Sequence, residues 1–235
     1  MVKQQPASRA KGFYILLGLL VLAGVVFIGT MATKNSTPKI VTANVTPGPA
    51  QGYLLGDANA PVQVIEFADF ECPACGQFSL VTEPDVRQRL VQTGKVAYRY
   101  FDFPLPMHRN TMAASLAAAC ANDQGKFWQM HDALFFNQPE WSSEATSDPM
   151  KFFANYAKQI GLDVTTWTQC VNDQKHLATI LGNRDEGNRV GVNQTPTFMI
   201  GKKLVVGAIG YDEFRAHVDS AMPPAAAPAP AKKSK

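Results

Sequence analysis

The amino-terminal part of the chain is dominated by one uncharged, mostly apolar stretch. Residues 13–33 (FYILLGLLVLAGVVFIGTMAT) number 21, and a helix of about 20 apolar residues crosses the roughly 30 Å hydrocarbon core of a bilayer. Lys3, Arg9 and Lys11 precede this stretch, so the positive-inside tendency places residues 1–12 in the cytoplasm. The pattern predicts a single-pass anchor in the inner or cytoplasmic membrane, with the remaining chain on the extracytoplasmic (periplasmic) side.

A cleaved signal peptide is the alternative interpretation of this stretch. The apolar region of a signal peptide usually has about 7–15 residues and ends at an A-x-A-like site. The stretch here is longer, and Thr30-Met31-Ala32 is a poor cleavage site. Both interpretations export the rest of the chain.

A globular domain is predicted between two segments of low complexity. Residues 34–51 contain three prolines and many small polar residues, as a linker does. Residues 223–235 (PPAAAPAPAKKSK) are predicted to be a disordered Pro/Ala/Lys tail. The domain between them covers residues 52–222, and the overall 46% apolar and 17% charged composition is typical of a folded chain.

Within this domain the hydrophobic period alternates between that of strands and that of helices. Val62 to Phe70 (VQVIEFADF) indicates a buried strand, and Pro73 is favoured at the first position of the helix that follows it. Asp148-Pro149 is expected to begin a later helix, Gly161 to end it and Asp163 to cap the next one. The other predicted elements are a strand at 96–101, several helices within 109–189, a hairpin of strands 197–200 and 204–206, and a last helix at 211–221.

This order of elements predicts an α/β fold. A strand–helix–strand unit followed later by an antiparallel pair fits an α/β core, into which residues 104–189 insert a helical subdomain. The aromatic group Phe127, Trp128, Phe135 and Phe136 is expected in the core of those helices. The net charge is only +3 with no basic stripe, which argues against a nucleic-acid partner.

The motif Cys72-Pro73-Ala74-Cys75 lies where the first buried strand ends and a helix begins. The first turn of a helix has unpaired N–H groups and a partial positive charge, which favour a thiolate at Cys72. A more acidic thiol supplies more nucleophile at neutral pH and is a better leaving group. Cys75, one turn later, is placed to resolve a mixed disulfide. We therefore expect an exposed, largely ionised Cys72 and a catalytic role for both cysteines.

Two other interpretations of the CxxC motif have less support. A structural zinc site needs about four ligands, whereas the chain has no second CxxC and only His108 and His131 lie in one stretch. No metal and no cofactor is therefore expected. A purely structural disulfide is the other alternative. His108 itself is expected to cap the insertion helix or to lie near the active site.

Several segments resemble the DsbA-like oxidoreductases of the thioredoxin superfamily. VIEFADFECPACGQF is similar to their active-site region, and VGVNQTPTFMIGKK to their cis-proline loop and the strand after it. FPLPMHRN and AAACANDQGKFWQMHDALF resemble the start of their helical insertion. The resemblance covers about residues 52–220 and implies a thioredoxin-like core with the activity of a protein thiol-disulfide oxidoreductase.

By this resemblance, Thr195-Pro196 forms a cis peptide bond that faces Cys72. A cis proline would place the backbone of Thr195 beside the sulfurs, where an extended substrate can pair with it. From the residues alone an ordinary trans proline is equally acceptable, because cis bonds are a minority even before proline.

Strand alternation puts Glu66 on the face opposite its neighbours in the first strand. If that strand is buried on both faces, desolvation raises the pKa of the carboxyl. Members of the family have an acid at this position, which implies that Glu66 shuttles a proton for the buried Cys75. The alternative is a solvent-facing carboxylate. Asp69 and Glu71 are nearer to Cys72 in the sequence, and their charges would oppose its thiolate if they lay close.

Cys120 and Cys170 fall in the helical insertion, where some members of the family carry a second disulfide. The resemblance therefore implies a structural bond between them. Closing a loop of about 50 residues stabilises a fold by around 4 kcal/mol in the chain-entropy model, and thiols outside the cytoplasm stay oxidised. Free buried thiols and a regulatory pair are the alternatives.

The predicted function is disulfide exchange with exported proteins that carry free thiols or disulfides, most directly as an oxidase. A stabilised thiolate makes the pair oxidising, although Ala74 stands where strongly oxidising DsbA has a histidine. The resemblance implies reoxidation by a quinone-linked membrane oxidase similar to DsbB, or a membrane reductase if the pair works in reverse. The alternatives are an extracytoplasmic reductase or isomerase, or a tethered peptide-binding protein or holdase. The short region before residue 52 favours a monomer.

Overall fold

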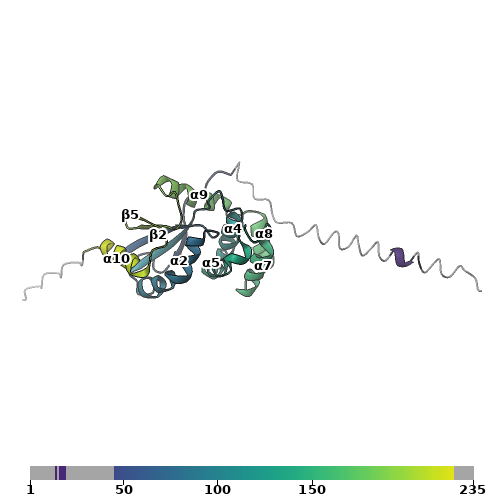
Figure 1. Cartoon of the computed structure of the whole chain (residues 1–235), viewed down its shortest axis with the longest axis horizontal. Coiled ribbons are helices and arrows are strands. Elements are labelled where there is room, and N and C mark those ends of the chain that lie inside the picture. Colours follow the sequence, from purple (N-terminus) through teal and green to yellow (C-terminus); the bar gives the residue numbers. More distant parts are fainter. Residues whose placement is uncertain (1–13, 15, 20–44, 225–235) are drawn as a thin grey trace, which may run out of the picture. The chain divides into compact units, whose positions relative to one another are not determined.

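The structure is a computed structural model that describes Tyr14, residues 16–19 and residues 45–224 (Figure 1). The chain divides into two units, Met1–Pro38 and Lys39–Lys235. The second unit contains every element discussed below.

Several predictions fall wholly or mostly outside the described residues. They are the cytoplasmic N-terminus 1–12, the anchor 13–33, much of the linker 34–51 and the tail 223–235. Among the residues that the structure does describe, none belongs to a helix with the length and apolar character needed to cross a membrane. The anchor therefore stays a prediction.

The described part of the domain is built on a five-stranded mixed sheet with the order β1-β3-β2-β4-β5. The strands are β1 (Tyr53–Leu55), β2 (Val62–Ala68), β3 (Val96–Asp102), β4 (Thr197–Ile200) and β5 (Lys203–Val206). The neighbours β2 and β3 are parallel, and the other three pairs are antiparallel. This arrangement confirms the predicted thioredoxin-like α/β core. Strand β1 was not predicted, because three residues are too few to show a period.

Strand β2 is shorter than its apolar run predicts. It ends at Ala68 instead of Phe70, because the residues after it form a turn. A carboxylate oxygen of Asp69 accepts the N–H of Glu71 at 2.7 Å, and the Asp69 carbonyl accepts the N–H of Cys72 at 3.1 Å. This turn redirects the chain into the next helix.

One face of the sheet is covered by three consecutive helices and the last helix of the chain, as Figure 1 shows for α2 and α10. They are α2 (Pro73–Val81), α3 (Glu83–Val86), the short π-helix η2 (Arg87–Val91) and α10 (Tyr211–Ala221). Phe78 of α2 packs against Phe198 of β4 and Phe214 of α10, with ring centroids 4.6 and 6.0 Å apart. This apolar layer fixes α2, and with it the CxxC motif, against the sheet.

The opposite face is covered by α9 (Leu177–Arg189), which Figure 1 places across the sheet from α2 and α10. Phe67, Phe101 and Phe103 form the apolar surface beneath it. The helix approaches closely at Gly187, where a Cβ atom would lie 2.6 Å from the Phe103 ring and 3.0 Å from the Phe67 ring. Only glycine fits at this contact.

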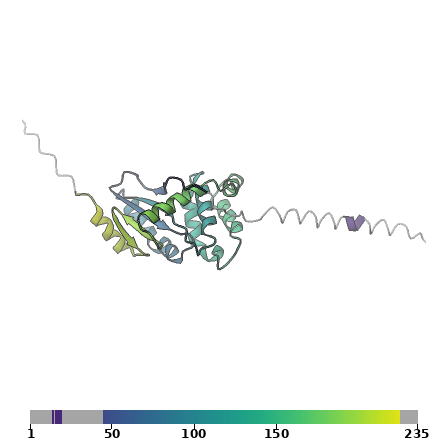
Figure 2. The same ribbon diagram turned by 90° about the horizontal axis from the view of Figure 1, so that it is seen from above.

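A helical insertion between β3 and α9 is present as predicted, and it lies beyond one end of the sheet in both views (Figures 1 and 2). It is shorter than the predicted 104–189, because α9 packs on the sheet. Its helices are α4 (Thr111–Asn122), α5 (Phe127–Phe136), α6 (Gln138–Trp141), α7 (Met150–Gln159) and α8 (Val164–Asn172). The Ala-rich α4 is buried along most of its length and contacts α5, α7 and α8. Small side chains suit this central position because they let three helices approach one axis.

Details within the insertion differ from the prediction. Helix α7 begins at Met150 with Pro149 as its cap, one residue later than expected. Asp163 caps α8 as predicted, since its carboxylate accepts the N–H of Thr166 at 2.9 Å. In the aromatic group, Phe127 and Phe135 are buried, whereas Phe136 is 72% exposed. Its place at the end of α5 turns it away from the core.

We expect Gly187→Ala to lower the free energy of unfolding by about 1–3 kcal/mol, because the added methyl group overlaps two buried rings. This loss should outweigh the gain of about 1 kcal/mol in helix propensity. Denaturant titration measures the change. Asn188→Ala, on the exposed face of the same helix, is the control and should not destabilise. A neutral or stabilising Gly187→Ala would contradict the close approach.

Candidate active site

The two cysteines of the CxxC motif lie at the start of α2. Cys72 is the residue that caps the helix, with extended backbone angles of φ −72° and ψ 122°, and Pro73 occupies the first helical position. The Cys72 carbonyl accepts the first helical hydrogen bond, from Gly76 N–H at 3.1 Å. Proline costs nothing here, because an N–H at this position has no helical partner. The Cys72 sulfur therefore lies at the positive end of the helix.

The loop before β4 supplies the opposite wall of the site. The Thr195-Pro196 peptide bond is cis, and the Cys72 thiol contacts the Thr195 carbonyl oxygen at 3.5 Å. Gly207 N–H donates to the Pro196 carbonyl at 2.8 Å, which ties the loop to the end of β5. The structure thus brings together residues 72 and 195, which are 123 positions apart in the sequence.

The two sulfurs have opposite environments. The pKa of Cys72 is lowered to about 6, chiefly by a hydrogen bond from the Cys75 side chain; partial burial opposes the shift, and Thr195 and the backbone N–H groups at the helix start support it. Burial raises the pKa of Cys75, and the charge of Cys72 adds to this effect. One sulfur is suited to attack and the other to hold a proton.

The expected exposure of Cys72 is wrong. The residue is only 7% exposed, and Cys75 is completely buried. The cause is the cis-proline loop, which covers the sulfur from the side that the helix leaves open.

Glu66 lies inside the protein on β2, 1% exposed, so the solvent-facing alternative does not apply. Its Oε2 accepts a hydrogen bond from the Tyr98 hydroxyl at 2.6 Å. Burial, followed by the nearby negative charge of Glu83, raises the pKa of Glu66 well above its ordinary value. The charge of Glu66 in turn contributes to the raised pKa of Cys75. These two groups are therefore electrostatically linked.

Asp69 and Glu71 do not act simply as opposing charges, since both carboxylates are used to organise the loop. Asp69 Oδ2 accepts from Leu105 N–H at 2.8 Å and lies 2.8 Å from His108 Nδ1. Glu71 Oε2 accepts from Asn110 N–H at 2.7 Å. These bonds join the turn before the motif to the start of the insertion.

His108 was expected either to cap the insertion helix or to lie near the active site, and the structure places it near the active site. Its hydrogen bond to Asp69 is the largest cause of a raised pKa, and partial burial opposes the shift. It lines a hollow of about 460 Å³ with Pro73, Met107 and Gln138 among its other walls. This hollow adjoins the first turn of α2.

Sequence reasoning missed Gln138. Its amide nitrogen donates to the Phe70 carbonyl at 2.7 Å and to the Cys72 carbonyl at 3.0 Å. Its side chain also lies against Gly76, where a Cβ atom would come within 3.0 Å of the amide oxygen. No local pattern signals this contact, because the residues are 66 or more positions apart.

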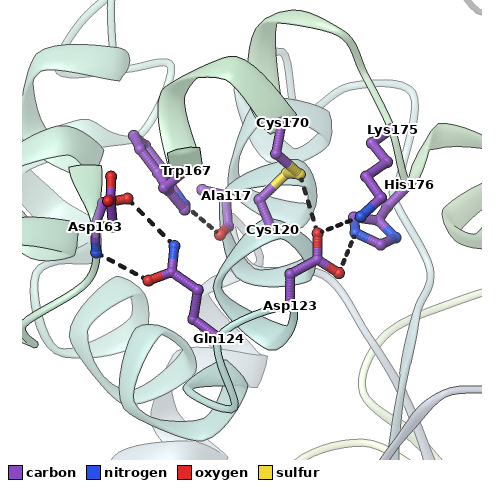
Figure 3. Close-up of a disulfide and its surroundings, with 9 residues drawn as sticks. All are labelled: Ala117, Cys120, Asp123, Gln124, Asp163, Trp167, Cys170, Lys175 and His176. Atoms are coloured by element: carbon purple, nitrogen blue, oxygen red, sulfur yellow. Dashed lines mark hydrogen bonds and ion pairs between the residues drawn. A yellow bond between two sulfur atoms is a disulfide. The ribbon is translucent and has the colours of Figure 1, made fainter. Parts of the chain in front are cut away.

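Cys120 and Cys170 form a disulfide that joins α4 to α8, with Cα atoms 5.9 Å apart (Figure 3). Asp123 lies beside it, 3.6 Å from the Cys170 sulfur, and pairs with Lys175 at 2.9 Å and His176 at 3.0 Å. The two sulfurs and the His176 ring form the one group with metal-like spacing found in the described part of the chain. Because the sulfurs are bonded to each other, neither offers the thiolate that zinc requires.

Strand β2, the CxxC helix α2 and strand β3 form one unit, and a cis-proline loop faces the CxxC motif. A helical insertion follows β3. Together these features define a thioredoxin-like fold. A family model described as thioredoxin matches residues 50–220. The chain belongs to the thioredoxin family, and its predicted DsbA-like character is confirmed by the comparisons that follow.

Three relatives illustrate the match. A crystal structure of Wolbachia pipientis alpha-DsbA1 superposes with a TM-score of 0.65 at 25% identity, covering 74% of this chain and 92% of that one. The probable disulfide bond formation protein D of Bacillus cereus is 23% identical over 184 residues, 78% of this chain and 85% of the relative. The Na(+)/H(+) antiporter NhaA 3 of Salinispora tropica is 33% identical over 191 residues, 81% of this chain. The chain spans only 28% of that antiporter's length.

We predict that the rate of Cys72 alkylation rises through a midpoint near pH 6, because the thiolate is the reactive form and its pKa is about 6. Mass spectrometry after pulses of iodoacetamide between about pH 4 and 9 measures the profile. In Cys72→Ser, the buried Cys75 should stay unmodified over this range until the protein is unfolded. A midpoint near the ordinary thiol value would contradict the described environment.

We expect the double variant Cys120→Ala/Cys170→Ala to lose about 2–5 kcal/mol of unfolding free energy, because the cross-link restrains the unfolded chain. Its Cys72 alkylation profile should be unchanged, since the disulfide joins α4 and α8 and does not contact Cys72. Denaturant titration and alkylation provide the two measurements. An altered Cys72 profile would instead indicate a regulatory pair.

Proposed function

We propose that this chain is a protein thiol-disulfide oxidoreductase that exchanges disulfides with exported proteins through Cys72 and Cys75, acting as an oxidase. The observation that carries the proposal is the contrast between the two sulfurs. Cys72 lies at a helix start with its pKa lowered to about 6, and Cys75 lies in the interior with its pKa raised. An exchange reaction needs this division between an attacking or leaving sulfur and a resolving one.

The proposed reaction begins from the Cys72–Cys75 disulfide. A substrate thiolate attacks the Cys72 sulfur, the bond between the two cysteines breaks, and Cys75 leaves and takes a proton from Glu66. A second substrate thiolate then attacks the substrate sulfur of the mixed disulfide, and Cys72 leaves as a thiolate. The substrate loses two electrons, which remain on the reduced pair as the Cys72 thiolate and the Cys75 thiol.

The direction follows from the stabilisation of the Cys72 thiolate. With a pKa of about 6, roughly nine-tenths of this sulfur is ionised at pH 7. A stabilised thiolate lowers the energy of the reduced protein relative to its disulfide, which makes the disulfide a better oxidant. The Ala74 side chain provides no charge and no hydrogen bond, so the Cys75 thiol, Thr195 and the backbone N–H groups of residues 74 and 75 supply this stabilisation.

The substrate is proposed to bind as an extended segment beside Thr195 and Pro196. The Thr195 carbonyl already contacts the Cys72 thiol, so a strand laid along this loop brings its own sulfur to the reactive one. The adjoining hollow beside Pro73 has an exposed Met107 at its edge. A flexible thioether surface suits clients of varied sequence.

The location and partners are part of the same proposal. The predicted anchor at 13–33 would hold the domain on the extracytoplasmic side, where disulfides persist. The described domain would act as a monomer and be reoxidised by a quinone-linked membrane oxidase similar to DsbB. The name of the Bacillus cereus relative, which refers to disulfide bond formation, supports the oxidative direction.

We predict that Cys75→Ala accumulates mixed disulfides with exported proteins, because its Cys72 thiolate attacks substrate disulfides and no resolving thiol remains to release the bound substrate. Cys72→Ser should form none and should not oxidise a reduced, unfolded test protein. Non-reducing electrophoresis followed by mass spectrometry detects the trapped pairs. A peptide-binding protein without redox function would keep its full activity in Cys72→Ser, which is the contrary outcome.

A redox titration of Cys72–Cys75 against glutathione decides the direction. The oxidase proposal expects a potential above that of the cytosolic reductant thioredoxin, which lies near −270 mV. A potential at or below that value would replace the oxidase with a reductase.

A further inference from the structure

A second group of buried polar side chains lies beneath α2, outside the dithiol itself. Glu83 of α3 is 1% exposed and His131 of α5 is fully buried. Among the described residues, Glu83 Oε2 and His131 Nε2 have no hydrogen-bond partner, yet they face each other at 3.8 Å. Leaving polar atoms buried without partners costs free energy, so this arrangement calls for an explanation other than stability.

The other side-chain atoms of Glu83 and His131, which point away from this contact, do have polar partners. Glu83 Oε1 accepts from Arg87 Nε at 2.9 Å. Arg87 also donates to both carboxylate oxygens of Asp132, at 3.0 and 2.7 Å. The Asp132 side chain is 54% exposed. The group therefore extends from a fully buried carboxylate to solvent.

The His131 ring is placed to exchange its proton between two nitrogens. Its Nδ1 lies 2.8 Å from Asp132 Oδ1, an acceptor, and 3.2 Å from an Arg87 nitrogen, a donor. With a proton on Nδ1 the ring donates to Asp132, and without one it accepts from Arg87. Both tautomers of the ring are thus supported on the outer side, while Nε2 faces Glu83 in either case.

The inner end of this group adjoins the residues used by the proposed reaction. Glu83 is close enough to Glu66 for its negative charge to raise the pKa of the Glu66 carboxyl. The ring of Tyr98, whose hydroxyl binds Glu66, lies 6.2 Å from the Trp128 ring. Trp128 in turn lies 5.0 Å from the His131 ring, and Arg87 stacks over it at 4.8 Å. These side chains share one compartment between the sheet, α3 and α5.

We propose that Glu83 and His131 form a proton route that connects the buried Cys75–Glu66 pair with solvent at Asp132. The inference rests on the proposed function, because only exchange at the dithiol requires Cys75 to gain and lose a proton. Cys75 has no exposed surface of its own. Along this route, Glu66, Glu83 and His131 would accept the proton in turn, and the half-exposed Asp132 would release it to solvent.

The steps of the route conserve charge and involve no electrons. When Cys75 becomes a nucleophile, its S–H proton passes to the Glu66 carboxylate and then to Glu83. Glu83 Oε2 protonates His131 Nε2, and the Nδ1 proton leaves through Asp132 to water. When Cys75 is the leaving group, the same steps run inward. The ionisable groups facing this compartment are Glu66 from β2, Tyr98 and Tyr100 from β3, Cys72 at the cap of α2, Cys75 from α2, Glu83 from α3, Arg87 from η2, and His131 and Asp132 from α5.

The test is His131→Gln in the full chain. Gln fills most of the space and can bond Asp132, but it cannot relay a proton between two ring nitrogens. We expect opening of the Cys72–Cys75 disulfide by a small thiol to slow about tenfold or more near neutral pH, as loss of a positioned acid–base group does. Its pH profile should change shape, while the Cys72 alkylation profile stays the same. Stopped-flow mixing with acid-quenched alkylation measures the rate.

Two further variants separate a proton route from a structural clamp. Glu66→Gln should slow the same step, and Glu66→Gln/His131→Gln should be no slower than Glu66→Gln alone, because both residues act on one proton. His176→Gln is the matched control, since it breaks another imidazole–carboxylate contact, at 3.0 Å to Asp123, next to the other disulfide. It should leave the rate and its pH profile unchanged.

An unchanged rate and pH profile in a folded His131→Gln would overturn the route, as would additive slowing in the double variant. If His131→Gln does not fold, Asp132→Asn decides instead, because it removes the exit carboxylate from a half-exposed position and should also slow the step. Failure of the proposed function looks different: the unaltered protein would then show no disulfide exchange through Cys72 at all.

Discussion

The site depends on one constraint, which is that the largely buried strand β2 must pass its chain to a helix whose first N–H groups have no partner within the helix. The turn at Asp69 makes this change of direction, and Cys72 occupies the capping position. No side chain of the helix satisfies these groups, so a negative charge on the sulfur meets a favourable field there. The same geometry carries Cys75 inward, one turn along α2. The difference in acidity between the sulfurs thus follows from the hydrogen bond that the Cys75 thiol gives to Cys72, from the backbone N–H groups at the helix start and from the burial of Cys75.

The acidic residues around the motif show how local charge can mislead. By sequence position alone, Asp69 and Glu71 oppose a thiolate at Cys72. In the fold, their carboxylates accept hydrogen bonds from backbone groups of the insertion, so part of their charge is balanced by those donors. These acids also bring the insertion against the first turn of α2. The helical insertion is therefore part of the active-site structure, and Gln138 adds a second connection from α6.

What could be predicted from the sequence divides by the distance between interacting residues. Strand β2, the CxxC helix and the final hairpin follow from local periods and from proline and glycine positions, and the structure contains them all. Strand β1 and the turn after Ala68 were missed, since three residues carry no period and a carboxylate turn interrupts an apolar run. The contacts of Glu66 with Tyr98, and of Gln138 with Cys72, join residues 32 and 66 positions apart. Such pairs have no signature in a single sequence, so the burial of Glu66 was foreseeable but its partner was not.

Glu83 and His131, which are buried beneath α2, do not have the arrangement that would stabilise the fold most. Replacing a buried ionic group with well-packed apolar residues of similar volume is often neutral or stabilising, and Glu83 and His131 each keep an atom without a partner. Arg87 and Asp132 would join η2 to α5 equally well without them, as their own two hydrogen bonds do. A structural role in joining η2 to α5 therefore explains Arg87 and Asp132, but it does not explain the unpartnered atoms of Glu83 and His131. A proton route accounts for these inner atoms, because disulfide exchange requires the buried Cys75 to gain and lose a proton.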